Sequence, residues 1–282
     1  MTQSDPIVSP AWLSEHLDAP DLRIIDASWF MPGDARNAKD LYDTRRIPGA
    51  IFFDIDEIAD TDSDLPHMLP SPEKFASRMK KLGIGDGCRI VIYDAQGLFS
   101  AARVWWTFRV MGVEDVAVLD GGFPAWERAG YPIETGAPQK RMERHFTARV
   151  RGDLVRGLAD MRRAVDGGAA ILDARPAPRF RGEAAEPRPG LKSGHMPGAR
   201  SVPSGSLVNE NGQMRSVEEL KRIFADAGAD PSRAAVCTCG SGITAAIIAL
   251  ALARMGRWDA AVYDGSWAEW GSRDDTAVVT GA

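Results

Sequence analysis

The amino-acid sequence predicts an α/β protein of two tandem domains, each a mainly parallel sheet flanked by helices on both faces. Two observations support this prediction. The chain repeats itself at a spacing of roughly 145 residues, which is too long for a solenoid and suits a duplicated domain. Each half also alternates short β-rich runs with helical stretches, and this alternation is typical of parallel strands joined by crossing helices.

Three pairs of matching segments define the repeat. They are RIIDASW (23–29) with AILDARP (170–176), RRIPGAIFFD (45–54) with GHMPGARSVP (194–203), and VLDGGFPAWERAG (118–130) with VYDGSWAEWGSR (262–273). Between the last two segments, each half holds a strand, a loop and a helix. In this alignment Asp94 takes the position of Cys239, so only the second copy has the thiol.

Helix signals and a stretch without periodicity divide the chain. The helical stretches at 71–83 and 216–228 each begin with a capping Ser and end with Gly. The polar segment ETGAPQKRMERHFTARVRGD lacks a clean period and is suited to a linker. We therefore expect a first domain over residues 1–137, a linker over 138–155 and a second domain over 156–282.

Composition bounds the class of protein. With 282 residues, 44% hydrophobic and 26% charged, the chain has the profile of a soluble globular protein. A net charge of −5 gives no reason to expect a nucleic-acid or membrane partner. The N-terminus has no signal-peptide pattern, and no apolar run approaches the roughly 20 residues of a membrane span, so we expect a cytoplasmic protein. Three cysteines are an odd number, which favours reduced thiols.

The loop CTCGSGIT (237–244) is the strongest candidate for chemistry. It lies between the apolar run 234–236, expected to end a buried strand, and the apolar helix expected over 245–256. Open α/β folds place their chemistry at such carboxyl ends of strands. Backbone N–H groups and a helix N-terminus around Cys239 favour a thiolate, and the same donors stabilise a persulfide. The alternative is that Cys239 is a small buried residue.

The other two cysteines are assigned no catalytic role. Cys237 lies inside the expected strand and belongs to the core, and Cys88 is expected to open a strand. A metal site on Cys237 and Cys239 needs two further ligands, and none of the four histidines lies nearby in sequence. We therefore expect no metal.

These motifs resemble the tandem-domain rhodanese-like sulfurtransferases, and within them the 3-mercaptopyruvate sulfurtransferases. The resemblance runs from SPAWL to DGSWAEW and rests on CGSGIT, DARPAPRFRGEAAEPRPGLKSGHMPGA and FFDIDEIADTDSDLPHMLPSPEKF. Thiosulfate-using relatives carry basic side chains after the cysteine, where this chain has Gly240 and Ser241. The resemblance therefore implies 3-mercaptopyruvate as the sulfur donor.

The resemblance also implies the roles of individual residues. Cys239 carries the sulfur as a persulfide, while the first domain is a catalytically inactive copy. Arg179 and Arg188 grip the carboxylate and carbonyl oxygens of the substrate. The implied site further includes the substrate-binding loop residues Gly240, Gly242, Ile243 and Thr244, and a proton relay of Asp56, His67 and Ser241.

The charge pattern agrees with a carboxylate ligand. Residues 173–200 hold six Lys and Arg against three Asp and Glu, and Arg binds carboxylates bidentately. Alternatives stay open for several side chains. Arg181 and Arg200 are expected to be solvated or paired with acids, and Arg175 is either an ion-pair partner of Asp173 or a substrate ligand. His67 and Asp56 have packing and turn-capping alternatives, and His195 is expected to be structural.

The expected reaction passes the persulfide sulfur to cyanide, a small thiol or a thioredoxin-like protein, without metal or organic cofactor. Three alternatives remain. Thiosulfate is the nearest rival donor. A cysteine phosphatase needs Arg six positions after the cysteine, where this chain has Ala245. A non-catalytic rhodanese-like module is the rival from a different class, and the presence of Cys239 argues against it.

Overall fold

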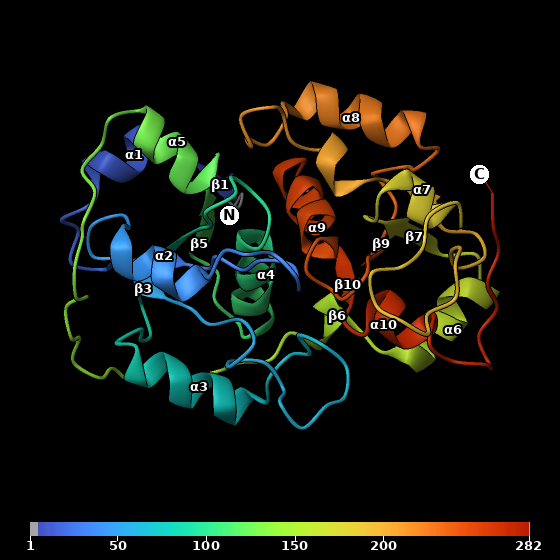
Figure 1. Ribbon diagram of the computed structural model, residues 1–282, viewed down its shortest axis with the longest axis horizontal. Coiled ribbons are helices and arrows are strands. Elements are labelled where there is room, and N and C mark those ends of the chain that lie inside the picture. Colours follow the sequence, from blue (N-terminus) through green and yellow to red (C-terminus); the bar gives the residue numbers. More distant parts are fainter. Residues whose placement is uncertain (1–4, 282) are drawn as a thin grey trace. The chain divides into compact units, whose positions relative to one another are not determined.

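A computed structural model of the chain describes residues 5–281, which form two compact units (Figure 1). The first unit contains residues 5–61, 69–151 and 210–214. The second contains residues 62–68, 152–209 and 215–281. Each half of the sequence therefore contributes one short segment, 210–214 or 62–68, to the unit built mainly from the other half.

The first unit has a five-stranded sheet in which every strand pair is parallel. Its strands run in the spatial order β1-β5-β4-β2-β3. Their bounds are Ile7–Val8 (β1), Leu22–Asp26 (β2), Ile51–Phe52 (β3), Arg89–Tyr93 (β4) and Val116–Leu119 (β5).

The second unit repeats this arrangement with five parallel strands in the order β6-β10-β9-β7-β8. The bounds are Val155–Arg156 (β6), Ala170–Asp173 (β7), Arg200–Ser201 (β8), Ala235–Thr238 (β9) and Ala261–Tyr263 (β10). Strand for strand, the order matches that of the first unit. The duplication and the parallel sheets expected from the sequence are confirmed.

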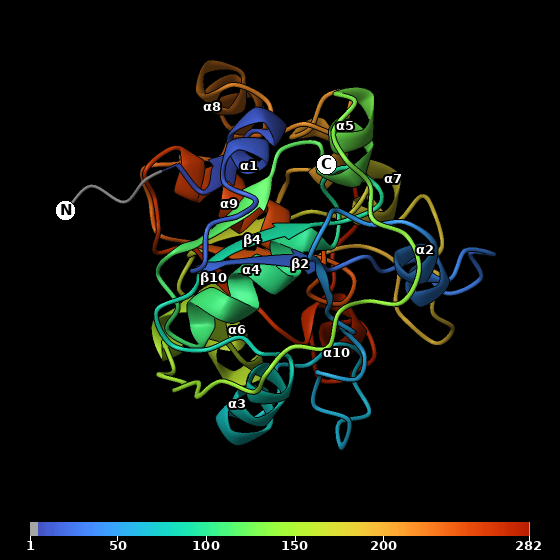
Figure 2. The same cartoon turned by 90° about the vertical axis from the view of Figure 1, so that its left-hand side faces the viewer.

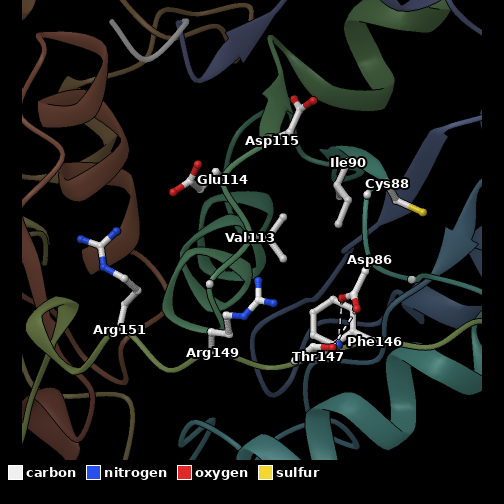
Figure 3. Close-up of a pocket in the computed structure, with 13 residues that line it drawn as sticks. Asp86, Cys88, Ile90, Val113, Glu114, Asp115, Phe146, Thr147, Arg149 and Arg151 are labelled. Atoms are coloured by element: carbon white, nitrogen blue, oxygen red, sulfur yellow. Dashed lines mark hydrogen bonds between the residues drawn. The ribbon is translucent and has the colours of Figure 1, made fainter. Parts of the chain in front are cut away.

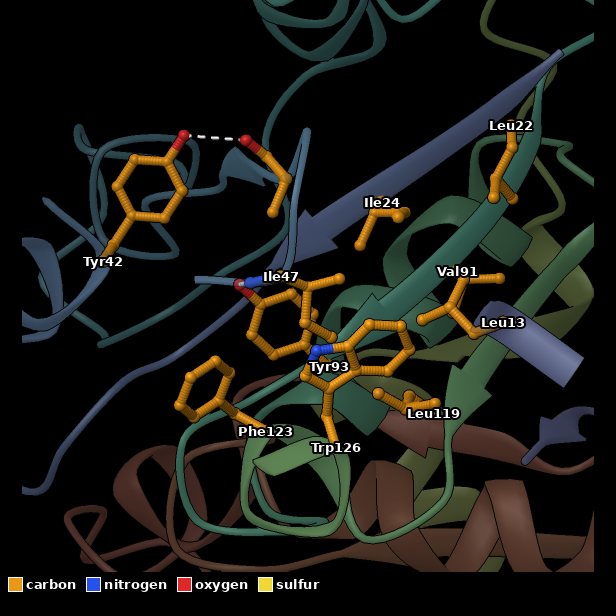
Figure 4. Packing of buried hydrophobic residues seen from close by; sticks show 11 residues of the cluster. Leu13, Leu22, Ile24, Tyr42, Ile47, Val91, Tyr93, Leu119, Phe123 and Trp126 are labelled. Carbon is orange, nitrogen blue, oxygen red and sulfur yellow. Dashed lines mark hydrogen bonds between the residues drawn. The ribbon is translucent and has the colours of Figure 1, made fainter. Parts of the chain in front are cut away.

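Helices cover both faces of the first sheet (Figure 2). Their bounds are Pro10–Glu15 (α1), Ala38–Thr44 (α2), Pro72–Lys81 (α3), Ala101–Val110 (α4) and Gly122–Arg128 (α5). On one face, side chains of α1, α2 and α5 pack on Ile24 and Val91 around the buried rings of Tyr93 and Trp126 (Figure 4). On the other, Phe75 of α3 and Phe108 of α4 meet edge to face at 5.1 Å.

The second unit follows the same plan. Its helices are Leu158–Asp166 (α6), Ala177–Phe180 (α7), Val217–Asp226 (α8), Ala245–Arg254 (α9) and Ser266–Trp270 (α10), with short 3-10 helices at Gly152–Leu154 and Ser204–Ser206. Residues of α6, α7 and α10 form one cluster with Val236 and Tyr263 of the sheet. Helix α9 contacts β9 and β10, and every residue of it before Arg254 is buried, as its apolar sequence predicts.

The two predicted capped helices are confirmed. The Ser71 hydroxyl accepts the N–H of Lys74 at the start of α3, and Gly83 beyond its end has a φ of 71°. Ser216 and Glu219 form a reciprocal capping box at the start of α8. Each arrangement satisfies N–H groups that the helix itself leaves without a partner.

The polar segment that follows α5 packs against the first unit. Phe146 lies edge to face with Phe75 at 5.5 Å, and the N–H of Arg149 donates to the carbonyl of Met111. A Cβ at Gly85 would lie 2.7 Å from the Cβ of Arg144, so the close approach of this segment requires glycine there. The chain passes to the second unit between Arg151 and Gly152. Among residues 5–281, no helix has the length and hydropathy of a membrane span.

Candidate active site

Cys239 follows the last residue of β9 and begins the loop 239–244, the thiol loop, which leads into α9. Its side chain is buried, with 2% of the residue exposed. The N–H of Gly242 donates to the Cys239 sulfur at 3.1 Å. Gly242 has a φ of 81°, a conformation that L side chains rarely adopt, so glycine is needed for the turn that directs this N–H at the sulfur.

Cys237 lies in β9 and is fully buried. Burial raises the pKa of its thiol well above the usual range, because a thiolate there would lose its hydration. The Cys237 thiol is therefore held in the protonated form, which agrees with the core position expected from the sequence.

Arg179 reaches the backbone of the thiol loop from α7. A Cβ on Gly240 would lie 3.2 Å from Nη2 of Arg179, so glycine at this position leaves room for the guanidinium. The Arg179 side chain is 18% exposed and pairs with the buried carboxylate of Glu186. A partly exposed guanidinium therefore lies against the residue that follows Cys239.

Glu186 divides its carboxylate between two arginines. Its Oε2 pairs with Arg179, and its Oε1 accepts from Nη1 of Arg175 at 2.7 Å. Arg175 also pairs with Asp173 and donates to the carbonyl of Gly194. These groups form a buried network of two carboxylates and two guanidiniums.

The Arg175 guanidinium carbon lies 4.1 Å from the centroid of the Trp267 ring, and the Arg175 side chain is 1% exposed. Of the two alternatives left open by the sequence, its contacts agree with the ion pair. The exposed pair of Arg181 with Glu183 agrees with the expectation for that residue.

The remaining predicted substrate-binding residues lie in the second unit. Arg188 is half-buried on the irregular segment after α7, Ser241 and Ile243 are buried in the thiol loop, and Thr244 precedes α9. His195 packs against the last residue of α7. Its ring stacks on Phe180 with centroids 3.7 Å apart, and its Nδ1 lies 2.9 Å from the Phe180 carbonyl oxygen.

The predicted relay residues fall in different units. Asp56 belongs to the first unit, where its exposed carboxylate accepts the indole N–H of Trp29 at 3.0 Å. His67 belongs to the second unit, is 8% exposed and has a φ of 62°. The relay through Ser241 stays a prediction.

In the first unit, the loop that matches the thiol loop encloses a carboxylate. Asp94 is fully buried at the end of β4. Its Oδ1 accepts the N–H of Gln96 at 2.8 Å, and its Oδ2 accepts the N–H groups of Phe99 and Ala101 at 2.8 and 2.9 Å. The donors at the start of α4 are therefore directed at a charge that belongs to the chain itself.

A second buried acid lies at the end of the neighbouring strand. Asp26 ends β2 and accepts the N–H and the hydroxyl of Ser28. Burial raises the pKa of Asp26 to about 6, while the Ser28 hydrogen bonds act in the opposite direction.

One contact of the thiol loop was missed from the sequence. It is made by Ser266, whose hydroxyl accepts the N–H of Cys239 at 3.3 Å. A signal for Ser266 exists in the repeat, because Gly122 occupies the matching position in the first copy.

A cavity of about 600 Å³ in the first unit lies away from these residues (Figure 3). Cys88, Ile90 and Asp115, at the amino ends of β4 and β5, line it with Phe146 and Arg149. Asp94 follows the carboxyl end of β4, whereas the cavity lies at the amino ends of the strands. Its lining includes none of the predicted site residues. Over residues 5–281, no cluster of three or more His, Cys, Asp or Glu is suited to a metal ion.

Comparison with known families matches the rhodanese-like domain to residues 9–129 and again to residues 158–273. The chain belongs to the rhodanese-like family. Among curated relatives, the 3-mercaptopyruvate sulfurtransferase of Escherichia coli (strain K12) is 44% identical over 273 residues, which cover 96% of both chains. Thiosulfate/3-mercaptopyruvate sulfurtransferase 1, mitochondrial, of Arabidopsis thaliana is 39% identical over 99% of this chain and 79% of its own.

A solved structure of the rhodanese-like family agrees with the fold. The crystal structure of SseA from Escherichia coli superposes with a TM-score of 0.86 at 41% identity, covering 94% of this chain and 99% of that one. The family resemblance and the fold class expected from the sequence are both confirmed.

We predict that Glu186→Gln lowers the free energy of unfolding by roughly 3 kcal/mol, since removing one partner from a buried ion network leaves the others uncompensated. Urea unfolding measures this loss. Glu183→Gln is the matched control, because its ion pair with Arg181 is exposed and its loss should leave the urea midpoint close to that of the wild type. Equal effects of the two variants would contradict the predicted importance of the network.

We predict that the stability difference between Asp26→Asn and the wild type depends on pH. The unfolded carboxyl ionises near its ordinary pKa of 3.8, whereas the folded one holds its proton to about pH 6. As pH rises from 4 to 7, the wild type should therefore lose up to about 3 kcal/mol relative to the Asn variant. Urea unfolding at several pH values measures the difference. Groups that ionise alike in the two proteins cancel from it. A difference that stays constant with pH would contradict the prediction.

Proposed function

We propose that this chain is a 3-mercaptopyruvate sulfurtransferase that works through a persulfide on Cys239. Its relationship to curated sulfurtransferases over nearly the full chain supports the activity. The observation that supports the residue assignment best is the 3.1 Å hydrogen bond from the Gly242 N–H to the Cys239 sulfur. A backbone donor at that distance stabilises negative charge on a thiolate or a persulfide.

Arg179 and Arg188 are proposed to hold the donor. A guanidinium matches the two oxygens of a carboxylate, and Arg179 lies against Gly240, next to the proposed nucleophile. Because Glu186 fixes Arg179, the carboxylate of the donor would meet a cation that is already in place. Gly240, Gly242, Ile243 and Thr244 are proposed to line the rest of the substrate site.

In the first proposed step, the Cys239 thiolate attacks the sulfur of 3-mercaptopyruvate. A sulfur–sulfur bond forms while the carbon–sulfur bond breaks, and its electron pair passes to the carbon skeleton as the enolate of pyruvate. The enolate takes up one proton and leaves as pyruvate. In the second step, an acceptor such as cyanide attacks the outer sulfur, the sulfur–sulfur bond breaks and the Cys239 thiolate returns.

The persulfide is proposed to pass sulfur to cyanide, a small thiol or a thioredoxin-like protein. A cytoplasmic location suits a reaction that needs a reduced thiol. The first domain is proposed to be inactive because Asp94 cannot carry sulfur.

The test compares donors. With cyanide as acceptor, we expect kcat/KM for 3-mercaptopyruvate to exceed that for thiosulfate by more than about a hundredfold, because residues 239–244 include no basic side chain to bind a dianion. Arg188→Ala should lower the value for 3-mercaptopyruvate by about tenfold to a hundredfold, as expected for a lost charged contact. A preference for thiosulfate would contradict the assigned donor while leaving the nucleophile open.

Intact mass tests the nucleophile separately. After incubation with donor, the wild type should gain about 32 Da, the mass of one sulfur, and Cys239→Ser should gain none. Cys237→Ser, which removes the neighbouring buried thiol, is the matched control and should still gain the sulfur. Appreciable turnover by Cys239→Ser would overturn the proposal.

The proposed relay of Asp56, His67 and Ser241 predicts a donor-specific effect. The thiol of 3-mercaptopyruvate carries a proton that must be moved, whereas thiosulfate carries none. We therefore expect His67→Asn to lower kcat for 3-mercaptopyruvate by at least about tenfold and to leave the slower thiosulfate reaction unchanged. His145→Asn, on the surface of the first unit, is the control. Equal losses with both donors would rule out a proton-transfer role for His67.

A further inference from the structure

We propose that Ser266 is a positioning residue for Cys239 and that its hydroxyl holds the thiol loop in its reactive geometry. The inference rests on the proposed role of Cys239 in sulfur transfer. It concerns the chain of contacts that links the start of α10 to that loop, all within the second unit.

Ser266 adopts a backbone conformation that disfavours serine. Of the described non-glycine residues, only His67 and Ser266 have φ in the left-handed region, at 62° and 48°. The first copy has Gly122 at the position of Ser266, with a similar φ of 54°. A Cβ there would lie 2.5 Å from the carbonyl oxygen of Asp94. The turn therefore suits glycine, and a side chain kept in spite of the strain points to a function.

The Ser266 hydroxyl both donates and accepts a hydrogen bond. It is buried, donates to the carbonyl of Tyr263 at 2.8 Å and accepts the N–H of Cys239 at 3.3 Å. A single hydroxyl therefore ties the backbone of the proposed nucleophile to the end of β10.

The next two residues continue the connection. The N–H of Trp267 donates to the Cys239 carbonyl and that of Ala268 to the Gly240 carbonyl, both at 2.9 Å. The first copy keeps the first of these contacts, since the N–H of Phe123 donates to the Asp94 carbonyl at 2.9 Å. The second copy adds the Ala268 contact, which Pro124 at the matching position cannot make, and the Ser266 hydroxyl, which accepts the N–H of Cys239 itself.

With both its N–H and its carbonyl held, the Cys239 backbone has little freedom to rotate. The Gly242 N–H can then stay at 3.1 Å from the sulfur. Loss of the hydroxyl would allow the loop to shift, and displacements of about an ångström at a reacting atom cost large factors in rate. Donor binding should change less than the rate, because Arg179 and Arg188, which are proposed to hold the donor carboxylate, lie on other segments.

The test uses Ser266→Gly, which installs the residue of the first copy, and Ser266→Ala, which keeps the Cβ. The glycine variant removes the hydroxyl while relieving the strain, so its thermal midpoint should equal or exceed that of the wild type. We expect kcat for 3-mercaptopyruvate to fall by about tenfold to a hundredfold in both variants, with KM within about twofold of the wild type. The rate of Cys239 alkylation by iodoacetamide, followed by peptide mass, should also fall.

Ser216→Ala is the matched control. It removes the capping hydroxyl of α8, lowers the thermal midpoint and should leave kcat and the alkylation rate unchanged. Wild-type kcat and alkylation rate in Ser266→Gly would overturn the inference, as would a rise in KM at constant kcat. Because alkylation of Cys239 needs no sulfur donor, this readout stands apart from the proposed function, which fails instead if Cys239→Ser keeps its turnover.

Discussion

The buried carboxylate of Glu186 is the interaction on which the geometry around Arg179 depends. A guanidinium cannot be buried without a partner, and one carboxylate here serves two of them. Through Arg175 it is also connected to Asp173 at the end of β7 and to the ring of Trp267 in α10. Arg179 is therefore fixed by the sheet and by a helix far away in sequence, and it can lie against Gly240 without losing further conformational entropy on binding an anion.

The two copies of the domain use different side chains to accept the backbone N–H groups of their matching loops. Both end a central strand in a loop whose backbone N–H groups point inward, and both must satisfy those donors. In the first copy the carboxylate of Asp94 accepts three of them, which leaves the donors saturated by a built-in anion. In the second copy the sulfur of Cys239 accepts one at 3.1 Å. The exchange of a carboxylate for a thiol at this position is therefore one difference between a structural loop and a proposed reactive one.

Much of this could be predicted from local sequence. Apolar runs and glycines give the strand, loop and helix around Cys239, and capping residues give α3 and α8, because those signals act within a few residues. The sharing of one carboxylate between Arg175 and Arg179 could not be predicted, since Glu186 lies on an irregular segment with no period to place it. Nor could the membership of residues 62–68 and 210–214 in opposite units, which depends on long-range packing. The left-handed φ of Ser266 has no signal in serine itself, and only the comparison with Gly122 reveals it.

The two copies differ in backbone strain at this turn, because one has serine and the other glycine. A left-handed serine costs free energy, and it persists only where the surroundings determine the conformation. Around Ser266 they do: its hydroxyl has two partners, the next two N–H groups are bonded to the loop, and Trp267 is fully buried beside Arg175. The first copy has glycine in the same turn and keeps only the N–H contact from Phe123 to the carbonyl of Asp94, whose side chain is a carboxylate. Strain and thiol occur together in one copy and are absent together from the other, as expected if the strained residue holds the thiol loop for chemistry rather than for folding alone.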